Sequence, residues 1–365
     1  MQICICRISV KIKIGDITKI RTGKLDANAA DENGQYPFFT CSKEPLKINT
    51  YSYDCECVLV AGNGDLNVKY YNGKFDAYQR TYIIEDDSDG LLFMPYLYFF
   101  MESYIDELRK QSIGGVIKYI KLKNLTDALI ELPSIEVQRK IVNIISKSKE
   151  IVRRKENEFE LLDELVRARF VEMFGDPIEN QKNWQVVKIG DIATDVRYGT
   201  SKPAVEGGKY PYLRMNNLTV DGGLDLNNLK YIDILDNEIE KCVVRKGDIL
   251  FNRTNSIDLI GKTAVFNLLD DMVIAGYIIR IRLNNQILPD VFSQYMNLEV
   301  MKKVLRGMAK GAVNQANINA QELQSIKVYI PNMELQKQYV EFKEEIDKSR
   351  LLSNHSLLLL KSIIF

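Results

Sequence analysis

Short apolar runs separated by turn residues fill the first 130 residues and the stretch from about 180 to 330. Gly247–Phe251 and Val58–Val60 are typical of strands, and Tyr277–Arg282 partly alternates between apolar and polar positions. Pro95 and Pro289 each stand where proline fits the first turn of a helix. Each stretch therefore predicts a mixed domain of strands and helices.

A long helical pattern follows each of these stretches. Residues 134–173 contain no proline or glycine, and Gly175 and Pro177 predict the end of this helix. Apolar residues recur at steps of three, four and seven, as in a coiled-coil seam. The seam positions are Ile141, Ile144, Ile151, Phe159, Leu162 and Val166 in the first helix and Leu335, Phe342, Ile346, Leu357, Leu360 and Ile364 in the second. We predict that the two helices pair antiparallel as a spacer; the alternative is that each packs only on its own domain.

The chain repeats itself, with five short strings returning in the same order. The offset is about 175 residues at the front and about 198 at the back, so the second copy holds about 23 extra residues in its middle. Similar ends with divergent middles are typical of one frame that carries two different binding surfaces. The pairs are 13–17 with 188–192, 21–23 with 197–199, 36–38 with 210–212, 95–98 with 289–292 and 133–139 with 331–337.

These patterns together predict an α+β chain with two similar mixed α/β domains, separated by two long helices that pair as an antiparallel coiled coil. The expected bounds are 1–132 for the first domain and 176–330 for the second, with spacer helices at 133–175 and 331–365.

Charge alone does not indicate a ligand. Lys and Arg together number 49, as do Asp and Glu, so the net charge is zero. Neither half is strongly basic, which argues against non-specific coating of DNA but leaves room for a few well-placed basic residues.

The six cysteines favour reduced thiols in a cytoplasmic protein, since no secretion signal accompanies them. Cys4/Cys6 and Cys55/Cys57 are spaced too closely for an ordinary structural zinc site, so half-buried strand thiols are favoured over metal binding. No apolar run is long enough to cross a membrane.

The motifs of common catalytic sites are missing from the sequence. The one histidine, His355, falls within the last helix, where a structural role is favoured over catalysis. Gly261-Lys262-Thr263 imitates the end of a phosphate-binding loop, but Ser256 replaces its leading glycine. No Pro-Pro pair suits the base-holding motif of adenine methyltransferases. We therefore expect a binding protein rather than an enzyme, without a metal site.

The repeated strings resemble the specificity subunits of type I restriction–modification enzymes along nearly the whole chain. In that family each target-recognition domain opens with a strand like 13–17 and 188–192 and closes with a Pro-x-x-Glu-x-Gln entry to a spacer helix, here 133–138 and 331–336. Gly247–Arg253 is similar to a further element of the family, and 173–177 followed by Trp184 is similar to its junction between domains.

The resemblance implies a non-catalytic subunit that reads double-stranded DNA, with one half-site of a bipartite, asymmetric target for each domain. It further implies two modification methyltransferase subunits and restriction/translocase subunits as partners. S-adenosylmethionine, ATP and Mg are then expected on those partners and no cofactor on this chain.

Base contacts are expected in the divergent middles, where Arg, Lys, Asn and Gln can pair with base edges and Tyr can flank them. The alternative for each residue is a solvated loop or turn position. The candidates are Asn63, Asn67, Lys69, Tyr71, Lys74, Tyr78, Gln79 and Arg80 in the first domain and Arg214, Asn216, Asn217, Arg253, Asn255, Lys262, Asn314, Gln315 and Asn317 in the second.

A spacer helix of about 40 residues spans about 60 Å. That length limits the separation of half-sites to about 18 base pairs, and we expect about one helical turn because both domains should meet the same face of the duplex.

Three other interpretations stay open: an orphan or truncated recognition module, the recognition part of an enzyme encoded in separate pieces, and a coiled-coil scaffold that binds only protein. The second helical pattern stops at Phe365, before the position that matches Met173, so a shortened last helix is expected.

Overall fold

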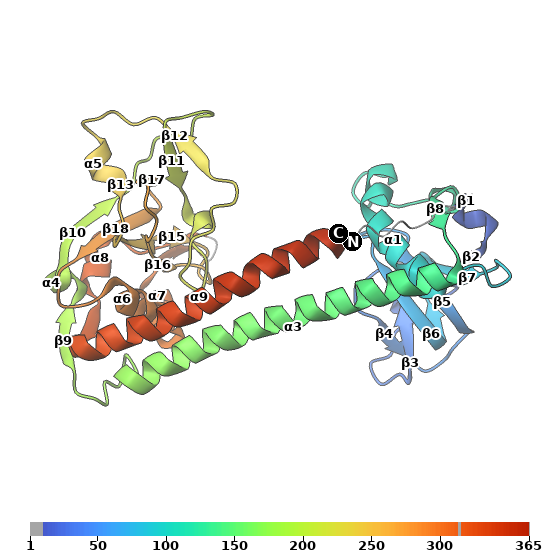
Figure 1. The fold of residues 1–365 in the computed structure, drawn as a ribbon, viewed down its shortest axis with the longest axis horizontal. Coiled ribbons are helices and arrows are strands. Elements are labelled where there is room, and N and C mark those ends of the chain that lie inside the picture. The colour runs from blue at the N-terminus through green and yellow to red at the C-terminus, as the bar shows by residue number, and fades with distance from the viewer. Residues whose placement is uncertain (1–9, 313–314, 365) are drawn as a thin grey trace, which may run out of the picture. The chain divides into compact units, whose positions relative to one another are not determined.

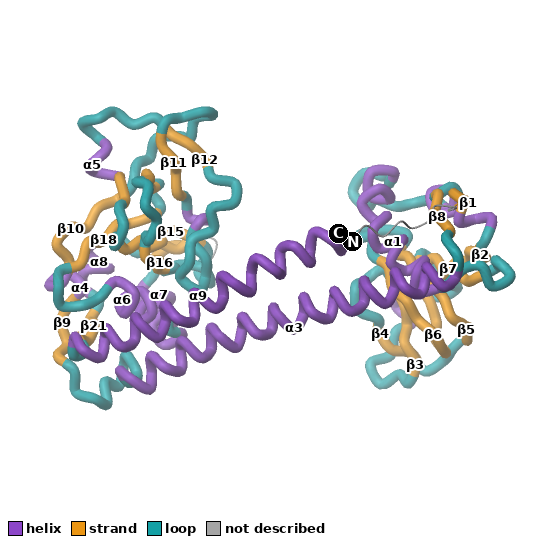
Figure 2. Tube along the Cα trace, in the orientation of Figure 1, coloured by secondary structure: helices purple, strands orange, loops and turns teal. Residues whose placement is uncertain are grey.

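The computed structural model describes residues 10–312 and 315–364. The chain forms two compact units (Figure 1). The first unit comprises the residues up to Arg154 together with those from Leu357, and the second comprises Lys155–Ser356. Both contain sheets as well as helices (Figure 2), which confirms the α+β class.

The first unit is built on a six-stranded sheet with the order β2-β7-β5-β6-β3-β4. A separate antiparallel pair, β1 with β8, joins the start of the unit to the segment that precedes its long helix. The strands are β1 (Val10–Lys13), β2 (Thr18–Thr22), β3 (Tyr36–Phe39), β4 (Leu46–Ile48), β5 (Tyr53–Ala61), β6 (Val68–Ala77), β7 (Thr81–Asp86) and β8 (Leu129–Leu132).

Apolar side chains from α1 pack against this sheet. Leu97, Met101 and Leu108 are buried with Val58 and Ile84 of the sheet, at the three- and four-residue steps of one helix face. The helices of this unit are α1 (Met94–Gln111), α2 (Leu122–Thr126) and the first half of α3 (Ile135–Phe174), with short 3-10 turns η1 (Ile14–Asp16) and η2 (Ala27–Ala29).

The second unit divides the corresponding strands between two four-stranded sheets, β10-β18-β14-β16 and β12-β11-β17-β13. A small sheet, β15-β20-β19, and the pair β21-β9 complete it. The strands are β9 (Gln185–Lys188), β10 (Ala193–Tyr198), β11 (Tyr210–Leu213), β12 (Lys230–Ile232), β13 (Val243–Val244), β14 (Ile249–Asn252), β15 (Thr254–Asn255), β16 (Thr263–Val265), β17 (Met272–Ile274), β18 (Ile278–Leu283), β19 (Lys310–Ala312), β20 (Gln315–Asn317) and β21 (Lys327–Ile330).

The largest core of the second unit lies between its first sheet and its helices, where Phe251, Ile279 and Phe292 are fully buried. The helices are α4 (Ile189–Ile192), α5 (Ile239–Cys242), α6 (Pro289–Asn297), α7 (Glu299–Met308), α8 (Ala320–Ser325) and α9 (Met333–Ile364), with the 3-10 turn η3 (Met215–Asn217) and the second half of α3.

Corresponding strands in the two units pair in the same way. β3 runs parallel to β6, and β11 runs parallel to β17. Gly23 and Gly199 each lie so close to the backbone of the neighbouring strand that an added Cβ would fall 2.2 Å from a carbonyl oxygen, of Ala77 and Ile274 respectively. The repeat seen in the sequence is therefore a repeat of structure.

The repeated Lys-Ile-Gly-Asp strings are helical turns and not the strands expected from the resemblance. Lys13 and Lys188 end strands β1 and β9, and the residues after them form η1 and α4. In the second copy the Asp191 carboxylate accepts a hydrogen bond from the Lys188 amide at 2.8 Å, as a capping side chain does. These turns pack against α2 and α8.

The glutamine of each Pro-x-x-Glu-x-Gln string is fully buried and joins the long helix to the domain. Gln138 accepts a hydrogen bond from the Phe93 amide and donates to the carbonyls of Leu91 and Pro133, each at 2.8 Å. Gln336 repeats this arrangement with the Leu288 amide and the carbonyls of Gln286 and Pro331. The string thus fixes where each spacer helix leaves its domain.

Within the second unit, the two long helices pack antiparallel. Tyr339 near the start of α9 makes edge-on ring contacts with Phe170 and Phe174 near the end of α3. Farther along α9, Arg350 pairs with Asp163, which lies earlier in α3. The contacts therefore run in opposite directions along the two helices, as the seam positions predict.

The predicted seam residues differ in burial. Val166 and Leu357 are buried, whereas Ile144 and Ile151 are 58% and 44% exposed and so lie off the packed face of α3. Half-buried positions are Ile141, Phe159, Leu162, Leu335, Phe342, Ile346 and Leu360. The side chains of Ile364 and His355 lie outside the described residues.

Candidate nucleic-acid interface

A groove of about 570 Å³ in the second unit contains several of the residues predicted to touch DNA. Arg214 follows β11 and Arg253 follows β14, and both line this groove with Asn216 and Tyr277. The remaining lining residues are Thr200, Ser201, Lys202, Pro203, Ala204, Tyr212, Met215, Ala275 and Gly276.

The two guanidinium groups of this groove are held in place by contacts within the protein, but some of their N–H donors have no partner among the described residues. Arg253 lies over the ring of Tyr198, with 4.8 Å between the guanidinium carbon and the ring centroid, and donates to the Gly276 carbonyl at 3.3 Å. Arg214 donates to the Asn228 carbonyl at 3.4 Å. The buried Nε atoms of both arginines have no hydrogen-bond partner among the described residues. Two oriented guanidinium groups can bind phosphate oxygens or the acceptor edge of guanine.

Three other predicted residues of the second domain make side-chain hydrogen bonds within the protein. Asn217 is 3% exposed and receives the Arg214 amide on its side-chain oxygen. Lys262 is 7% exposed, its ammonium donates to the carbonyls of Met215 and Leu218, and burial lowers its pKa. Asn255 donates to the side chain of Asn252. These bonds stabilise the loops around the groove, and they occupy polar groups that a contact with bases would need.

The small sheet β15-β20-β19 carries two further predicted residues of this domain, Gln315 and Asn317. Gln315 is exposed on β20, and the buried side-chain oxygen of Asn317 has no hydrogen-bond partner among the described residues. Asn216 is exposed. Asn314 lies outside the described residues.

In the first unit, three predicted contacts are used by the fold. Asn67 donates to the Cys41 carbonyl at 2.8 Å and Lys69 to the Ser42 carbonyl at 2.7 Å. Burial lowers the pKa of Lys69. Tyr71 packs its ring against Phe39 in the core. These three residues hold a surface loop and the sheet together.

The other predicted residues of the first unit are more accessible. Gln79 and Arg80 are exposed on the connection between β6 and β7, and Asn63 and Tyr78 are half-buried. Lys74 is exposed, with its ammonium 4.6 Å from the centroid of the Tyr51 ring.

Backbone hydrogen bonds show which positions of the two units correspond. The Gly62 amide donates to the Arg80 carbonyl at 2.8 Å, and the Arg253 amide donates to the Tyr277 carbonyl at 3.0 Å. Gly62 therefore occupies in the first unit the place of Arg253 in the second, and Arg80 occupies the place of Tyr277. The same frame presents different chemistry in each unit.

Tyr198 and Tyr277 line this surface but were not among the predicted residues. Both are substantially exposed, at 43% and 49%. Tyr198 belongs to a repeated string, where it replaces Thr22, and an aromatic residue next to a repeated glycine was the available signal.

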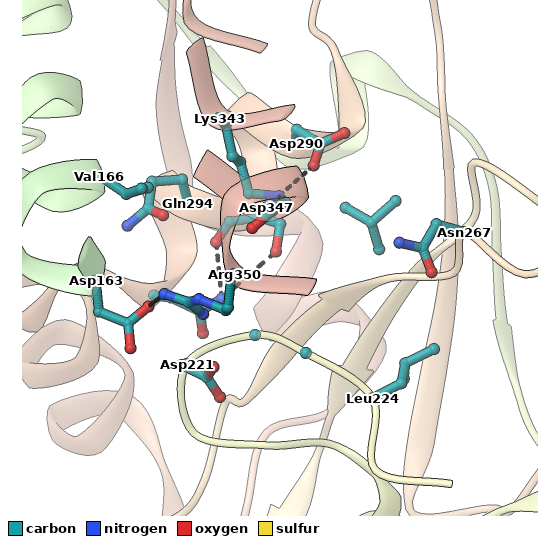
Figure 3. Close-up of a pocket in the computed structure, with 15 residues that line it drawn as sticks. Asp163, Val166, Asp221, Leu224, Asn267, Asp290, Gln294, Lys343, Asp347 and Arg350 are labelled. Atoms are coloured by element: carbon teal, nitrogen blue, oxygen red, sulfur yellow. Dashed lines mark hydrogen bonds and ion pairs between the residues drawn. The ribbon is translucent and has the colours of Figure 1, made fainter. Parts of the chain in front are cut away.

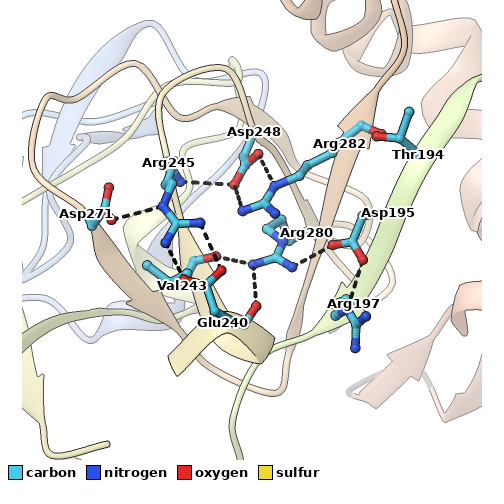
Figure 4. A network of polar contacts seen from close by, with 10 residues as sticks. All are labelled: Thr194, Asp195, Arg197, Glu240, Val243, Arg245, Asp248, Asp271, Arg280 and Arg282. Atoms are coloured by element: carbon cyan, nitrogen blue, oxygen red, sulfur yellow. Dashed lines mark hydrogen bonds and ion pairs between the residues drawn. The ribbon is translucent and has the colours of Figure 1, made fainter. Parts of the chain in front are cut away.

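A network of charged groups links β18 to β10 and to the segment around α5 in the second unit (Figure 4). Arg280 on β18 is buried and donates to Asp195 on β10 at 2.5 Å and to the carbonyls of Glu240 and Val243. Burial raises the pKa of Asp195, but hydrogen bonds from Arg280 and Arg197 outweigh it and lower the pKa overall. The network ties α5 to the sheet.

A second polar cluster lies where α3, α6 and α9 meet, around a cavity of about 170 Å³ (Figure 3). Lys343 of α9 pairs with Asp290 of α6, and Arg350 of α9 pairs with Asp163 of α3. The first pair fastens α9 to the body of the second unit, and the second pair joins α9 to α3.

Metal and membrane signals are absent from the part of the chain that the structure describes. There, no group of three or more His, Cys, Asp or Glu side chains is placed to hold a metal ion. Cys55 and Cys57 lie on β5 as free thiols, and Cys4 and Cys6 fall outside the described residues. No described helix is long and apolar enough to span a membrane.

Comparison with known proteins gives one family. Residues 9–161 and 181–360 match the model of the type I restriction modification DNA specificity domain. The EcoDI specificity subunit of Escherichia coli is 45% identical over 123 residues, which are 34% of this chain and 27% of that protein. The MjaVIII specificity subunit of Methanocaldococcus jannaschii is 22% identical over 367 residues, which are 92% of this chain and 85% of that protein. The chain thus matches only about a quarter of the length of the EcoDI subunit.

The fold agrees with the sequence comparison. The crystal structure of a type I restriction–modification S subunit from M. genitalium covers 100% of this chain, and 96% of that chain is covered in turn. The TM-score is 0.63 at 15% sequence identity. Since the family model matches most of the chain in two segments, one in each repeat, the chain belongs to the DNA specificity subunits of type I restriction–modification systems, which are non-catalytic.

Proposed function

We propose that this chain reads a bipartite, asymmetric DNA site, with one half-site for each domain, bounded as 1–132 and 176–330. It joins two modification methyltransferase subunits and the restriction/translocase subunits of a type I complex in the cytoplasm. S-adenosylmethionine, ATP and Mg bind to those partner subunits, and this chain recognises the DNA sequence.

The observation that carries this proposal is the repeated frame with different side chains. Arg253 and Tyr277 in the second unit replace Gly62 and Arg80 at the corresponding places of the first. A guanidinium and a phenol present different hydrogen-bonding groups to a base pair, so the two domains are suited to different half-sites.

The spacer helices supply surface for the partner subunits. Ile144, Leu161 and Leu165 of α3 and Leu351 and Leu352 of α9 are exposed apolar residues. Apolar side chains exposed along a helix are typical of protein interfaces. Docking of the methyltransferase subunits is therefore expected to depend on the exposed residues of 134–173 and 332–365.

Methylation sequencing tests the proposal. A strain that expresses this chain with its neighbouring methyltransferase gene should carry a bipartite, asymmetric adenine motif, with a gap of about one helical turn between its halves. The motif should disappear when this chain is deleted. An active methyltransferase whose motif does not change on deletion would contradict the proposal.

A protein scaffold that does not bind DNA is the main alternative. Phosphate contacts release counterions, so DNA binding by this chain should weaken steeply as salt rises, whereas a scaffold shows no such DNA binding. An orphan module would bind DNA but would not retain methyltransferase subunits on purification.

A further inference from the structure

A hairpin in the first unit has an apolar tip that the fold does not use. The amide and carbonyl of Ile113 both pair with Tyr119, at 3.0 and 2.9 Å, and close the 113–119 hairpin. Val116 at its tip is fully exposed and Ile117 is 63% exposed. Ile113 and Tyr119 are also more than one-third exposed, so the side chains form a small apolar patch.

The backbone of this hairpin is well defined. Gly114 has φ +117°, and a Cβ added there would lie 2.5 Å from the Ile117 carbonyl oxygen, so the turn requires glycine. The Ile120 amide donates to the Gly62 carbonyl at 2.9 Å, and the Gly64 amide donates to the Lys118 carbonyl at 3.0 Å. The hairpin is therefore anchored beside the connection that carries Asn63.

The second unit has a hairpin in the corresponding place. The Ile318 amide donates to the Arg253 carbonyl at 2.9 Å, as Ile120 does to Gly62. Gly311, with φ +115°, approaches the Gln315 carbonyl oxygen as Gly114 approaches that of Ile117. This hairpin, formed by β19 and β20, exposes the polar side chain of Gln315, whereas the side-chain oxygen of Asn317 is buried.

Charge around the apolar tip favours DNA over a protein partner. Residues 112–126 include Lys118, Lys121 and Lys123 and no acidic residue. Lys118 and Lys121 are exposed, and the exposed Arg80 lies on the neighbouring connection, where its carbonyl binds the Gly62 amide. A hairpin with an apolar tip and lysines close to it suits a DNA duplex. The lysine ammonium groups can contact phosphates while the apolar side chains reach the bases in a groove.

We propose that Val116 and Ile117 insert into a groove of double-stranded DNA and contact the bases of the first half-site, while the hairpin of the second unit makes polar contacts with the other half-site. This inference rests on the proposed function and adds the chemistry by which the two half-sites are distinguished.

The test uses the whole complex of this chain with its methyltransferase subunits and duplexes that carry the methylation motif. The double variant Val116→Ser, Ile117→Ser should bind the intact site about tenfold more weakly or worse, as expected for lost base contacts. The slope of log affinity against log salt should stay the same, because no phosphate contact is removed. The variant Lys118→Ala should instead reduce that slope by about one.

Duplexes with one scrambled half-site locate the contact. The double variant should match the unsubstituted complex on DNA that lacks the first half-site, and Gln315→Ala should affect only the other half-site. Leu129→Ser is the matched control, because Leu129 is also an exposed apolar residue of the first unit, on β8, and its substitution should leave binding unchanged.

Two results would overturn the inference. One is a double variant that binds and methylates DNA as well as the unsubstituted complex does. The other is a double variant that loses its methyltransferase subunits, which would make the tip a protein contact. If the unsubstituted complex itself fails to bind the bipartite duplex, the proposed function fails as well, so the two failures are distinguishable.

Discussion

At the scale of single residues, positive charge in the second unit has two uses. Arg214 and Arg253 line the groove, whereas Lys262, Lys302 and Arg280 are buried and bind the protein's own oxygens. A buried cation requires hydrogen bonds and a nearby negative charge or carbonyl, so its substitution affects stability more than recognition.

Lys302 predicts a pH-dependent stability. Its ammonium donates to the Gly261 carbonyl and the Asn297 side chain, and burial together with the charges of Arg306 and Lys262 lowers its pKa to about 7. The unfolded chain keeps an ordinary lysine pKa, so above pH 7 it binds one proton more than the folded chain, and stability rises with pH. Urea unfolding between pH 6.5 and 8.5 should show this rise relative to Lys302→Met. Parallel pH profiles for the two proteins would contradict the assignment.

Arg280 predicts a large loss of stability on substitution. Arg280→Met removes the donor to one carboxylate oxygen of Asp195, which keeps its bond from Arg197, and the donor to two carbonyls, at an expected cost of about 3–5 kcal/mol in the free energy of unfolding. Arg245→Met is the matched control, since Arg245 pairs with Glu240 and Asp271 at the surface, and about 1 kcal/mol or less is expected. Equal losses for both variants in denaturant titrations would show that the buried Arg280 contributes no more to stability than the surface Arg245 does.

The orientation of side chains, toward the groove or toward the protein, was the least predictable feature of the candidate interface. Asn217, Lys262 and Lys69 have side chains suited to base or phosphate contacts, and the sequence places them in the divergent middles as it does Arg253. Whether such a side chain faces a groove or a backbone carbonyl depends on the tertiary fold, which composition and spacing do not encode.

At the scale of elements, the sequence predicted more. The prolines at the start of α1 and α6, the glycine that ends α3 and the absence of breakers within it all place helix ends correctly, because helix termini depend on local chemistry. It was harder to predict from the sequence where a strand continues. Asn72 and Gly73 have the composition of a turn, yet they lie within β6, where pairing with Glu56 and Cys55 of β5 outweighs local propensity.

We expect the length of the spacer helices to set the distance between the two half-sites, so that the helices act as a molecular ruler. We expect that inserting one heptad into α3 after Arg154, with a matching heptad in α9 after Asn354, lengthens the spacer by about 10 Å and the gap in the methylation motif by about three base pairs. Matched insertions preserve the seam, because seven residues restore its register.

A seven-residue insertion after Leu269 is the control for the ruler. Leu269 is exposed on the connection between β16 and β17, so the gap should not change. A motif with an unchanged gap in the heptad variant, from an active complex, would show that the helices do not set the spacing.

At the scale of the whole molecule, duplication followed by divergence accounts for the asymmetric target that we propose. The two frames agree where the Gln138 and Gln336 side chains join spacer to domain, and they differ where Arg253 replaces Gly62. The repeat was visible in the sequence because the segments that join each helix to its domain are short contiguous strings present in both halves of the chain. The side chains that we propose for DNA contact were only partly predictable, because they come from loops far apart in the chain.

The most direct test of this account is the methylation motif of a strain that carries Arg214→Ala with Arg253→Ala. Loss of both guanidinium groups should relax one half of the bipartite motif and leave the other half and the gap unchanged. Relaxation of both halves, or an unchanged motif from an active complex, would contradict the claim that each domain reads its own half-site.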